Sequence, residues 1–381
     1  MMNLVFISGY FNHHQRFLSD ALAARCSYTF ISTTPYNRKR LALGWTPEKE
    51  PDYVCHYDAQ PERAEELLKN ADLVITGGAP EKLVRRCIRR GQLVMRYSER
   101  PLKKGLQWKK YLPRLIKWHS QNPPWRKVYL LCASAYTAGD YGRFGLFRGK
   151  AFRWGYFPEQ KQYASGEELL SKKKKATILW AGRFLELKHP DDAIGLAARL
   201  KAAGYDFRLD IIGSGEMESQ LREMIAREQL ADRVRMLGAM KPEQVRAHME
   251  EAEIFLFTSD RREGWGVVLN EAMNSGCCVV ADHAIGSAPF LVQSGENGLL
   301  YRSGDTDDLY HKVASLLDDP KRRQKLGLRA YETVTREWNP ETAACRLLEL
   351  AKGLLEGKKA TPFPQGPCSK AEELREDWFK G

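Results

Sequence analysis

Two glutamates stand with seven residues between them in the stretch EGWGVVLNEAMNSG, residues 263–276. The apolar run EIFLFTS (253–259) precedes this stretch and the run CCVVA (277–281) follows it, which predicts a strand, a loop, a helix and a parallel strand. Glu263 then lies in the loop, and Glu271 lies about a turn and a half into the helix. Acids at the carboxyl end of a strand can act on a ligand, although two solvated acids beside an ordinary helix start would show the same spacing.

The residues between the two acids suit a phosphorylated ligand. Backbone amides from Trp265 to Val268 would form a helix N-terminus, whose unpaired N–H groups attract an anion. The glycines on either side of Trp265 allow the backbone to turn and to approach a ligand closely. The Glu271 carboxylate can accept two hydrogen bonds from a vicinal diol such as that of ribose. The stretch therefore predicts a nucleotide held by its phosphate and ribose, with Glu263 facing the group beyond the phosphates.

Two cations follow another predicted strand, in LWAGRFLELKHPDD (179–192). Arg183 and Lys188 come before a helix that Pro190 and Asp191 would open, so both fall at the carboxyl end of the strand. A guanidinium grips phosphate oxygens through two hydrogen bonds, and an ammonium supplies a compact charge, a combination that suits a departing diphosphate. Taken singly, each residue is equally well explained as a surface cation on a loop.

The chain of 381 residues is long enough for two domains, and its apolar runs alternate with helical patterns, as in parallel sheets covered by helices on both faces. We therefore predict an α/β protein with an N-terminal domain at 1–160, a linker at 161–175 and a C-terminal domain at 176–338. Residues 339–381 form a C-terminal helix and tail that could pack back on the N-terminal domain. The predicted strands are 3–8, 28–32, 72–76, 92–97 and 128–134 in the first half, and 177–181, 208–213, 234–237, 253–259, 277–281 and 298–301 in the second.

Positive charge is concentrated in one part of the chain. The formal net charge is +12, yet residues 81–175 alone hold 24 lysines and arginines against 6 aspartates and glutamates. An anionic partner of the first half is therefore expected, either a membrane surface, a phosphorylated acceptor or nucleic acid. Within this region, residues 103–127 interleave lysines and arginines with tryptophans, which suits an anionic membrane interface. Alternatively, Leu115, Ile116 and the tryptophans pack on the first sheet and the cations are only solvated.

The remaining composition favours a cytoplasmic protein. The chain has no run of eighteen apolar residues, and its start, MMNLVFISGYFNHHQ, predicts a buried strand and lacks the pattern of a signal peptide. The eight cysteines form no C-x-x-C motif and lack the pattern of neighbouring histidines that a zinc site needs, so we expect reduced thiols, most of them in the core, and no zinc site. Peripheral contact with the inner face of the membrane is a further expectation.

Together these stretches resemble the retaining glycosyltransferases of GT-B fold, specifically family 4, the glycosyl transferases group 1 set. The resemblance covers residues 176 to about 340 and includes the glycine loop IIGSGEMESQL (211–221) and the segments VRMLGAMKPEQVRAHMEEAEIFLFTS (234–259) and IGSAPFLVQSGENGLLY (285–301). The first half matches only loosely, through FISGYFNHHQRFLSDAL and KAFRWGYFPE (150–159). The resemblance implies two doubly wound, Rossmann-like domains that face a central cleft.

The resemblance also implies roles for individual residues. Arg183 and Lys188 would hold the donor diphosphate, Glu263 would bind the transferred sugar, and all three would act in catalysis. Glu271 would bind ribose. Backbone donors to phosphate would be Trp265, Gly266, Val267 and Val268, and Leu237 and Gly238 would line the base. In the first domain Gly9 takes the place of the glycine loop near the acceptor, although SGYFNHHQ lacks the double glycine of many members. Further acceptor-side candidates are His13, His14, Arg96 and Glu99, each of which also has a structural explanation.

The predicted chemistry needs no metal and no cofactor. Negative charge builds up on the departing diphosphate, so fixed cations and amides stabilise the transition state more than the ground state. The paired aspartates at 191–192, 307–308 and 318–319 fall at predicted helix ends, where capping explains them. A double-displacement nucleophile is not evident, so the resemblance favours attack by the acceptor on the same face, with retention of configuration.

The predicted function is that of a hexosyltransferase. It would move a sugar from a nucleotide-diphosphate sugar to a glycan or polyprenyl-diphosphate-linked acceptor in cell-surface polysaccharide or glycoconjugate assembly. A non-catalytic relative that binds sugar nucleotides is the main alternative. A nucleic-acid-binding protein would explain the basic region, but the sequence has no RNA-binding aromatic signature or helix-turn-helix, so no nucleic acid partner is predicted. A nicotinamide dehydrogenase is disfavoured because GSGEME lacks the third glycine of its motif.

Overall fold

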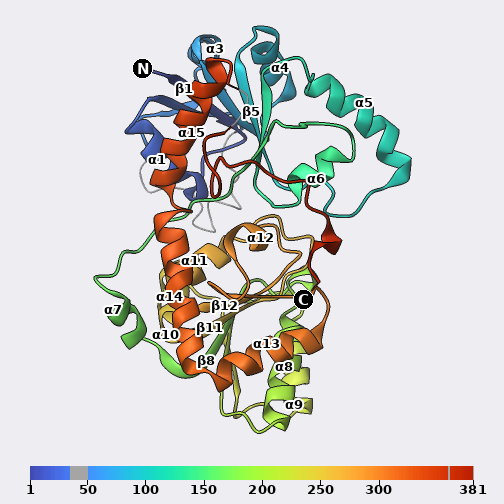
Figure 1. Ribbon diagram of the computed structural model, residues 1–381, viewed down its shortest axis with the longest axis vertical. Helices are drawn as coiled ribbons and strands as arrows, with labels where there is room; N and C mark the ends of the chain where they lie inside the picture. The colour runs from blue at the N-terminus through green and yellow to red at the C-terminus, as the bar shows by residue number, and fades with distance from the viewer. Residues whose placement is uncertain (35–49, 359–360, 381) are drawn as a thin grey trace. The chain divides into compact units, whose positions relative to one another are not determined.

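The computed structural model describes residues 1–34, 50–358 and 361–380, which form two compact units (Figure 1). The first unit comprises residues 1–159 and 338–375, and the second comprises residues 160–337 and those from 376 onward. The chain therefore passes from one unit to the other at three places in the sequence. The C-terminal helix that follows residue 338 belongs to the first unit, whereas the last described residues belong to the second.

Residues 161–175, predicted as a linker, are structured and belong to the second unit. They contain helix α7 (Gly166–Ser171) and the first residues of a strand that begins at Lys174. The Ser165 side chain caps the helix, and Lys173 Nζ donates to three backbone carbonyls of the second unit. The sequence pattern missed this order because it depends on a cap and on contacts with residues far along the chain.

The first unit is built on a parallel sheet whose seven described strands run in the order β3-β2-β1-β4-β5-β6-β7. The strands are β1 (Asn3–Ser8), β2 (Ser27–Ser32), β3 (Val54–His56), β4 (Leu73–Gly77), β5 (Leu93–Ser98), β6 (Val128–Cys132) and β7 (Ala151–Arg153). The helices are α1 (His13–Ala23), α3 (Pro61–Asn70), α4 (Glu81–Arg89), α5 (Tyr111–Gln121), α6 (Thr137–Gly142) and α15 (Pro340–Leu355), with a 3-10 turn η1 (Trp108–Lys110) before α5. Helix α15 packs against α1, although more than three hundred residues separate them (Figure 1).

The C-terminal segment covers the open edge of this sheet. The amide of Cys368 donates to the carbonyl of Arg153 at 2.7 Å, and the amide of Ala371 donates to that of Ala151 at 3.0 Å. In return, the Arg153 amide donates to the carbonyl of Ser369 at 2.7 Å. Residues 368–371 therefore act as a short additional strand beside β7, and they satisfy an edge that would otherwise expose unpaired backbone groups.

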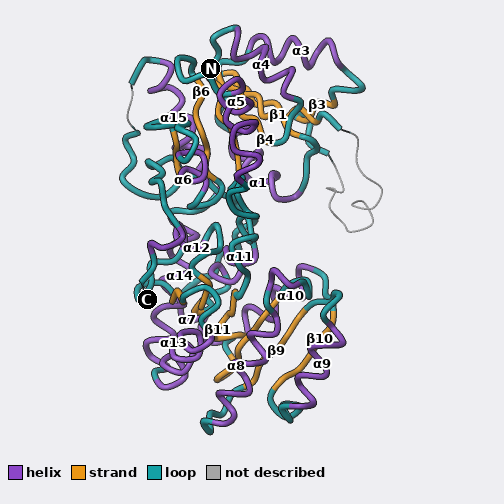
Figure 2. The backbone as a smooth tube through the Cα atoms, turned by 90° about the vertical axis from the view of Figure 1, so that its right-hand side faces the viewer, coloured by secondary structure: helices purple, strands orange, loops and turns teal. Residues whose placement is uncertain are grey.

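The second unit is built on a parallel sheet whose described strands run in the order β10-β9-β8-β11-β12-β13, which is the doubly wound order 3-2-1-4-5-6. The strands are β8 (Lys174–Ala181), β9 (Arg208–Ile212), β10 (Val234–Gly238), β11 (Ala252–Phe257), β12 (Cys278–Asp282) and β13 (Leu299–Tyr301). The helices are α8 (Pro190–Ala202), α9 (Glu218–Arg227), α10 (Pro242–Glu251), α11 (Val268–Asn274), α12 (Ala288–Leu291), α13 (Thr306–Asp318) and α14 (Pro320–Arg336), with 3-10 turns η2 (Glu186–Lys188) and η3 (Glu376–Trp378). Figure 2 shows α9 beside the edge strand β10 and its neighbour β9.

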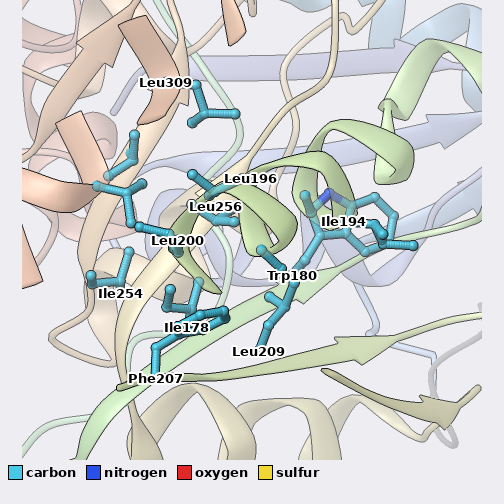
Figure 3. Packing of buried hydrophobic residues seen from close by; sticks show 14 of the residues in the cluster. Ile178, Trp180, Ile194, Leu196, Leu200, Phe207, Leu209, Ile254, Leu256 and Leu309 are labelled. Atoms are coloured by element: carbon cyan, nitrogen blue, oxygen red, sulfur yellow. The ribbon is translucent and has the colours of Figure 1, made fainter. Parts of the chain in front are cut away.

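Apolar residues from sheet and helix meet in the core of the second unit (Figure 3). Trp180 and Ile178 of β8 and Ile254 of β11 pack against Ile194 and Leu200 of α8, and all of these side chains are buried. Uniformly apolar strands of this kind need helices on both faces, as the sequence predicted. This layer fixes β8 next to β11 and so sets the positions of the loops that follow them.

The strand order reverses at one point in each sheet. In the second unit β8 and β11 are paired neighbours in the sheet, while their following connections lead to opposite sides. In the first unit the same reversal lies between β1 and β4. Such a switch point leaves a crevice at the carboxyl ends of the strands, where open α/β sheets bind ligands. The loops after β8 and β11 are therefore the expected place for a ligand in the second unit.

Two further predictions can be compared with the structure. All eight cysteines are free and all but Cys345 are buried, which confirms the expectation of thiols that lie mostly in the core. Across the described residues, no helix combines the length and the apolar composition that a bilayer crossing requires.

Candidate functional site

The loops after β8 and β11 are fastened to each other. The Thr258 hydroxyl lies 2.7 Å from the carbonyl oxygen of Lys188 and 2.9 Å from that of His189. The amide of Asp260 donates to the carbonyl of Leu187 at 2.9 Å. These contacts fix the backbone of turn η2 against the end of β11. The Lys188 side chain therefore starts from a defined position at the switch point.

Lys188 and Glu263 form an ion pair between these two loops. The two side chains are only 17% and 14% exposed, so water screens the pair weakly. The structure thus brings together two residues that the sequence placed separately, each at the end of a strand. An anion bound at Lys188 would compete with Glu263 for the ammonium, and a displaced Glu263 carboxylate would be a hydrogen-bond acceptor for a neighbouring hydroxyl.

Arg183 stands in the same loop as Lys188. Its side chain is exposed, and within the described part of the chain it has neither an ion pair nor a hydrogen bond. The backbone beneath it is fixed, because the amide of Gly182 donates to the carbonyl of Ile212 at 3.0 Å. At Gly213 φ is 146° and a Cβ would lie 1.8 Å from the Gly182 oxygen, so only glycine fits. The glycine loop after β9 therefore holds the segment that presents the Arg183 guanidinium.

Helix α11 begins later than the sequence predicted, and Glu271 accordingly lies in its first turn. The cause is Gly266, which precedes the helix with φ of 80°, outside the helical region. A Cβ on Gly266 would lie 2.2 Å from the ring of Phe257, so the position requires glycine. The helix starts at Val268, and the side chain of the preceding residue, Val267, does not cap the backbone amides of the first turn.

Trp265 is a core residue, since its side chain is 1% exposed and its Nε1 donates to Asn270 Oδ1 at 2.8 Å. Its carbonyl accepts a hydrogen bond from Ser287 Oγ at 2.5 Å. The indole is therefore committed to packing. Any contribution of Trp265 to a ligand comes through its backbone, which is the role that the resemblance implied.

The Glu271 carboxylate is half-buried and, among the described residues, accepts no hydrogen bond. Burial raises the pKa of this carboxyl, and the positive charge of Arg246 partly opposes the rise. Arg246 itself is occupied, because its Nη1 donates to the backbone carbonyl of Glu271 at 2.9 Å and to Ser275 Oγ at 3.1 Å. A partly desolvated acceptor without a donor is well suited to two hydroxyls of a ligand.

Leu237 and Gly238 end the edge strand β10. Gly238 has φ of 75°, and its carbonyl accepts the amide of Gly213 at 2.9 Å. These two residues therefore border the glycine loop, which in turn holds the Arg183 segment. They lie at the carboxyl ends of the strands, as do the other predicted donor residues, but within the described part of the chain no hydrogen bond joins them to Lys188 or Glu263.

A group of side chains at the start of α8 could hold a metal ion. His189, Asp191 and Asp192 offer ligand atoms that lie within 4.8 Å of one another. The His189 ring also lies 3.3 Å from Asp260 Oδ2. Burial, and then the charge of Asp191, raise the pKa of Asp192. Both aspartates stand in the first turn of α8, where the helix dipole favours acids, so the helix start accounts for them as well.

Two acids near this site, Asp260 and Asp282, were not predicted as site residues from the sequence. Asp260 follows β11, and although burial acts to raise its pKa, hydrogen bonds from Arg262 outweigh it and lower the pKa. Asp282 ends β12, where burial raises its pKa to about 7 in spite of a 2.7 Å hydrogen bond from the amide of Ala284. The signal was available, because each acid comes directly after an apolar run in the sequence.

In the first unit, the structure gives Arg96 a structural role. Its guanidinium forms two 2.9 Å hydrogen bonds with the Glu81 carboxylate and further bonds with the Gln121 carbonyl and Asn122 Oδ1. The Arg96 side chain is therefore occupied by its own domain.

Gly9 lies after β1 at the switch point, and a Cβ there would make only an ordinary contact with Thr34, so sterics do not demand glycine.

The other acceptor-side candidates gather around Tyr156. Its hydroxyl donates to Glu99 at 3.1 Å, and its ring lies 6.0 Å from that of His14 and 5.7 Å from that of Tyr97. The His13 ring lies 3.8 Å from the His14 ring. Burial, and then the neighbouring His13, lower the pKa of His14 to about 4, so this imidazole is neutral at physiological pH. The two tyrosines were not among the residues that the sequence singled out.

Part of the second unit matches a known protein family. Residues 164–333 match the family Glycosyl transferases group 1. A GDP-mannose-dependent alpha-(1-6)-phosphatidylinositol monomannoside mannosyltransferase of Mycobacterium tuberculosis is 28% identical over 200 residues, which cover 51% of this chain and 50% of that protein. The putative colanic acid biosynthesis glycosyltransferase WcaL of Salmonella typhimurium is 33% identical over 179 residues, which cover 45% of this chain and 44% of that protein. The chain thus spans about half the length of the curated relatives it matches.

Solved structures extend the likeness over both units. Anabaena Alr3699/HepE in complex with UDP has a TM-score of 0.68 at 16% identity, and the match covers 92% of this chain and all of that one (100%). Sucrose-phosphate synthase from Thermosynechococcus elongatus has a TM-score of 0.65 at 18% identity, with 94% and 100% covered. The fold is accordingly the GT-B fold of glycosyltransferases, built from two Rossmann-like domains. Within it, residues 164–333 are the part that matches the glycosyl transferases group 1 family.

Proposed function

We propose that this protein is a retaining, metal-independent glycosyltransferase that uses a nucleotide-diphosphate sugar as its donor. The observation that carries the proposal is the ion pair of Lys188 and Glu263 at the switch point of the second sheet. The loop after β8 carries the exposed guanidinium of Arg183. Helix α11, which follows β11 across the same switch point, carries the carboxylate of Glu271, a group that can accept hydrogen bonds. Cations for a diphosphate and acids for hydroxyls are therefore grouped where such sheets bind nucleotides.

The chemistry follows from the charge that develops during transfer. As the bond between the anomeric carbon and the diphosphate breaks, negative charge accumulates on the leaving oxygen, and Arg183 and Lys188 would stabilise it. Occupation of Lys188 by the diphosphate would free Glu263 to accept a hydroxyl of the transferred sugar. Glu271 would accept the ribose hydroxyls and keep the nucleotide in register.

Retention of configuration is inferred from the family. The acceptor hydroxyl would attack on the face from which the diphosphate departs, and the proton it releases would pass to the departing oxygen. Because side-chain cations already supply positive charge to that oxygen, we propose that no divalent metal and no cofactor is needed. The group of His189, Asp191 and Asp192 makes this point directly testable by chelation.

The acceptor is proposed to be a glycan or a polyprenyl-diphosphate-linked lipid, in cell-surface polysaccharide or glycoconjugate assembly at the cytoplasmic face of the membrane. The names of the relatives support this class, since they include a phosphatidylinositol monomannoside mannosyltransferase and a colanic acid biosynthesis glycosyltransferase. The cluster of His14, Glu99 and Tyr156 offers polar groups on the first unit for such an acceptor.

A thermal-shift screen with nucleoside diphosphates and their sugars tests the donor assignment. A true ligand at a hundred times its Kd should stabilise the protein by about 2.7 kcal/mol, and Glu271→Gln should reduce the shift. Turnover is then measured with the sugar nucleotide that binds. Stabilisation without glycosyl transfer to any acceptor would favour a non-catalytic binding protein instead.

A further inference from the structure

Helix α5 has two apolar faces, and only one of them is covered by the protein. Tyr111, Leu115 and Trp118 pack on a small cluster formed by the buried side chains of Leu102, Phe144 and Leu146. The hydroxyl of Tyr111 donates to the carbonyl of Arg143 at 3.2 Å. This face anchors α5 at the periphery of the first unit (Figure 1). The anchoring residues are therefore not available to a partner.

The second apolar face is open. Leu112 and Ile116 are 61% and 65% exposed, and they lie one turn apart on the same side of the helix. Trp108, in the turn before α5, is 77% exposed, and Trp125, in the turn after it, is 80% exposed. Apart from Met1, these four are the most exposed large hydrophobic side chains in the described part of the chain. The alternative that Ile116 and all the tryptophans pack on the sheet is therefore wrong for this face.

The exposed face carries only positive charge. Residues 100–139 contain no aspartate or glutamate. The lysines and arginine next to the open face are exposed, and none of them has an ion pair within the described residues; they are Lys109, Lys110, Lys117, Arg126 and Lys127. Lys103 differs, because it pairs with Glu99. A second copy of the chain would present the same charges and be repelled, so the partner of this face should be anionic.

The turn that displays Trp125 is held in place. Lys150 Nζ donates to the carbonyls of Pro124 and Arg126, at 2.6 and 2.9 Å. The amide of Arg126 donates to the carbonyl of Pro123 at 3.1 Å. An exposed tryptophan on a fixed turn loses little conformational entropy when it docks. This arrangement is typical of a surface that is preformed for contact.

We propose that this face of α5, with Trp108 and Trp125 at its ends, docks on an anionic phospholipid bilayer. The apolar side chains would enter the boundary between headgroups and acyl chains, where indole rings are favoured. The surrounding lysines would meet the negative surface potential of the lipids. The surface lies on the first unit, so the proposal goes beyond donor binding and does not depend on the glycosyl transfer proposed above.

Co-sedimentation of the full chain with vesicles tests the charge requirement. We expect binding to vesicles of phosphatidylglycerol and phosphatidylcholine, and none to phosphatidylcholine alone. Lys109→Gln with Lys110→Gln should lower the partition coefficient by roughly tenfold or more, since each surface cation contributes strongly at an anionic membrane. The matched control is Lys321→Gln with Lys325→Gln, which removes two exposed lysines of α14 and should change partitioning less than about twofold.

Insertion is tested separately. Leu112→Ser with Ile116→Ser should lower partitioning by roughly tenfold, because two exposed apolar side chains would no longer enter the bilayer. The control Leu355→Ser removes an apolar side chain that is 37% exposed on α15 and should leave partitioning unchanged. Lipids with brominated acyl chains should quench tryptophan fluorescence in the wild type, and Trp108→Phe with Trp125→Phe should remove most of the quenching.

Several outcomes would overturn the proposal: no binding to anionic vesicles at low salt, equal losses in the control variants, or binding without quenching. A concentration-dependent dimer that disappears in Leu112→Ser with Ile116→Ser would assign the face to a second copy. The same variants should keep the wild-type thermal shift with nucleoside diphosphates. Failure of membrane docking is thereby distinguished from failure of the donor site.

Discussion

Lys188 and Glu263 form an ion pair across the ends of β8 and β11, although they stand 75 positions apart in the sequence. The pair links the loop that also carries Arg183 to the loop that leads into Glu271. With both side chains largely buried, neither charge is well solvated when its partner is removed. The pair therefore couples the stability of the second unit to the charge state of its candidate site.

Removal of either partner should destabilise the protein, and removal of both should restore part of the loss. Lys188→Ala or Glu263→Ala leaves an unpaired charge at a cost of about 1–3 kcal/mol. In the double variant neither charge remains, so the sum of the single effects should exceed the double effect. Denaturant unfolding of the four proteins measures this coupling, and strictly additive losses would contradict it.

The same variants should separate in their kinetics. Lys188→Ala removes positive charge from the leaving group and should lower kcat by roughly 100-fold. Glu263→Ala should lower turnover more than it lowers nucleotide affinity, since Glu263 is assigned to the sugar. Wild-type kcat and KM in both variants would show that the site is assigned wrongly.

Arg183→Ala should impair donor binding without affecting the fold. Because the guanidinium is exposed and unpaired in the described structure, stability should change by less than about 0.5 kcal/mol. Affinity for a nucleoside diphosphate should fall by about 1.5–3 kcal/mol, while affinity for the nucleoside should stay the same. Titration calorimetry with both ligands measures the difference, and Arg183→Lys, which keeps the charge, should recover part of it. Equal losses for the two ligands would point to a folding defect.

Glu271→Gln should weaken donor binding by about 1.5–3 kcal/mol, because an amide forms weaker hydrogen bonds to a diol than a carboxylate does. Burial raises the pKa of Glu271, so the carboxylate becomes protonated at a higher pH than an ordinary glutamate as the solution is acidified. Donor affinity of the wild type should therefore fall on acidification, and the Gln variant should lack this part of the pH dependence. Affinity profiles of the same shape in both proteins would remove Glu271 from the ribose site.

The sequence predicted the sheets well, because their strands carry the signal in their own residues. Every predicted strand overlaps one in the structure. The two strands that the pattern missed, β3 and β7, have three residues each and lie at the outer positions of the first sheet. Strand β7 pairs on its outer side with residues 368–371. The sequence around β7 does not predict this pairing. Edge strands this short are defined by their neighbours rather than by their own composition.

The sequence predicted the positions of several site residues but not their contacts with one another. Strand ends place Lys188 and Glu263 individually, but their contact depends on β8 lying next to β11, which is a property of the whole sheet. Similarly, the pattern could not show that the Trp265 indole is committed to Asn270. Nor could it show that Arg96 is committed to Glu81. Side-chain partners of this kind follow from tertiary packing, whereas the backbone turns at Gly213 and Gly266 were marked by the glycines themselves.

Activity should survive treatment with EDTA, because side chains supply the positive charge at the leaving group. The group of His189, Asp191 and Asp192 is the place where a required metal would bind within the described residues. Asp192→Asn should therefore leave turnover in the presence and absence of Mg²⁺ or Mn²⁺ unchanged within about twofold. A metal-dependent reaction would be established if chelation abolished the activity of the wild type and either ion restored it. In that case neither ion should restore activity to Asp192→Asn.

Asp282 should make the stability of the second unit fall as the pH rises from 3.8 to about 7. Burial, together with the nearby Asp260 and Asp192, raises its pKa from 3.8 to about 7, against hydrogen bonds from the Ala284 amide and the Ser303 residue that act to lower it. Between pH 3.8 and about 7 the Asp282 carboxyl holds a proton in the folded protein that it has lost in the unfolded chain. The contribution of this proton to stability is therefore complete below pH 3.8 and disappears as the pH rises to about 7.

Asp282→Asn keeps an oxygen for the Ala284 amide and removes the charge. The variant should therefore be more stable than the wild type at pH 8, by on the order of 4 kcal/mol, and nearly equal to it at pH 4. Urea unfolding across this range measures the effect. As a control, Asp232→Asn at the surface should leave the slope between pH 4 and pH 8 nearly unchanged, because the hydrogen bond from Lys201 lowers the pKa of Asp232 from 3.8 and so confines its effect to more acidic solution. Parallel stability curves for the wild type and Asp282→Asn would show that Asp282 does not bind this proton in the folded protein.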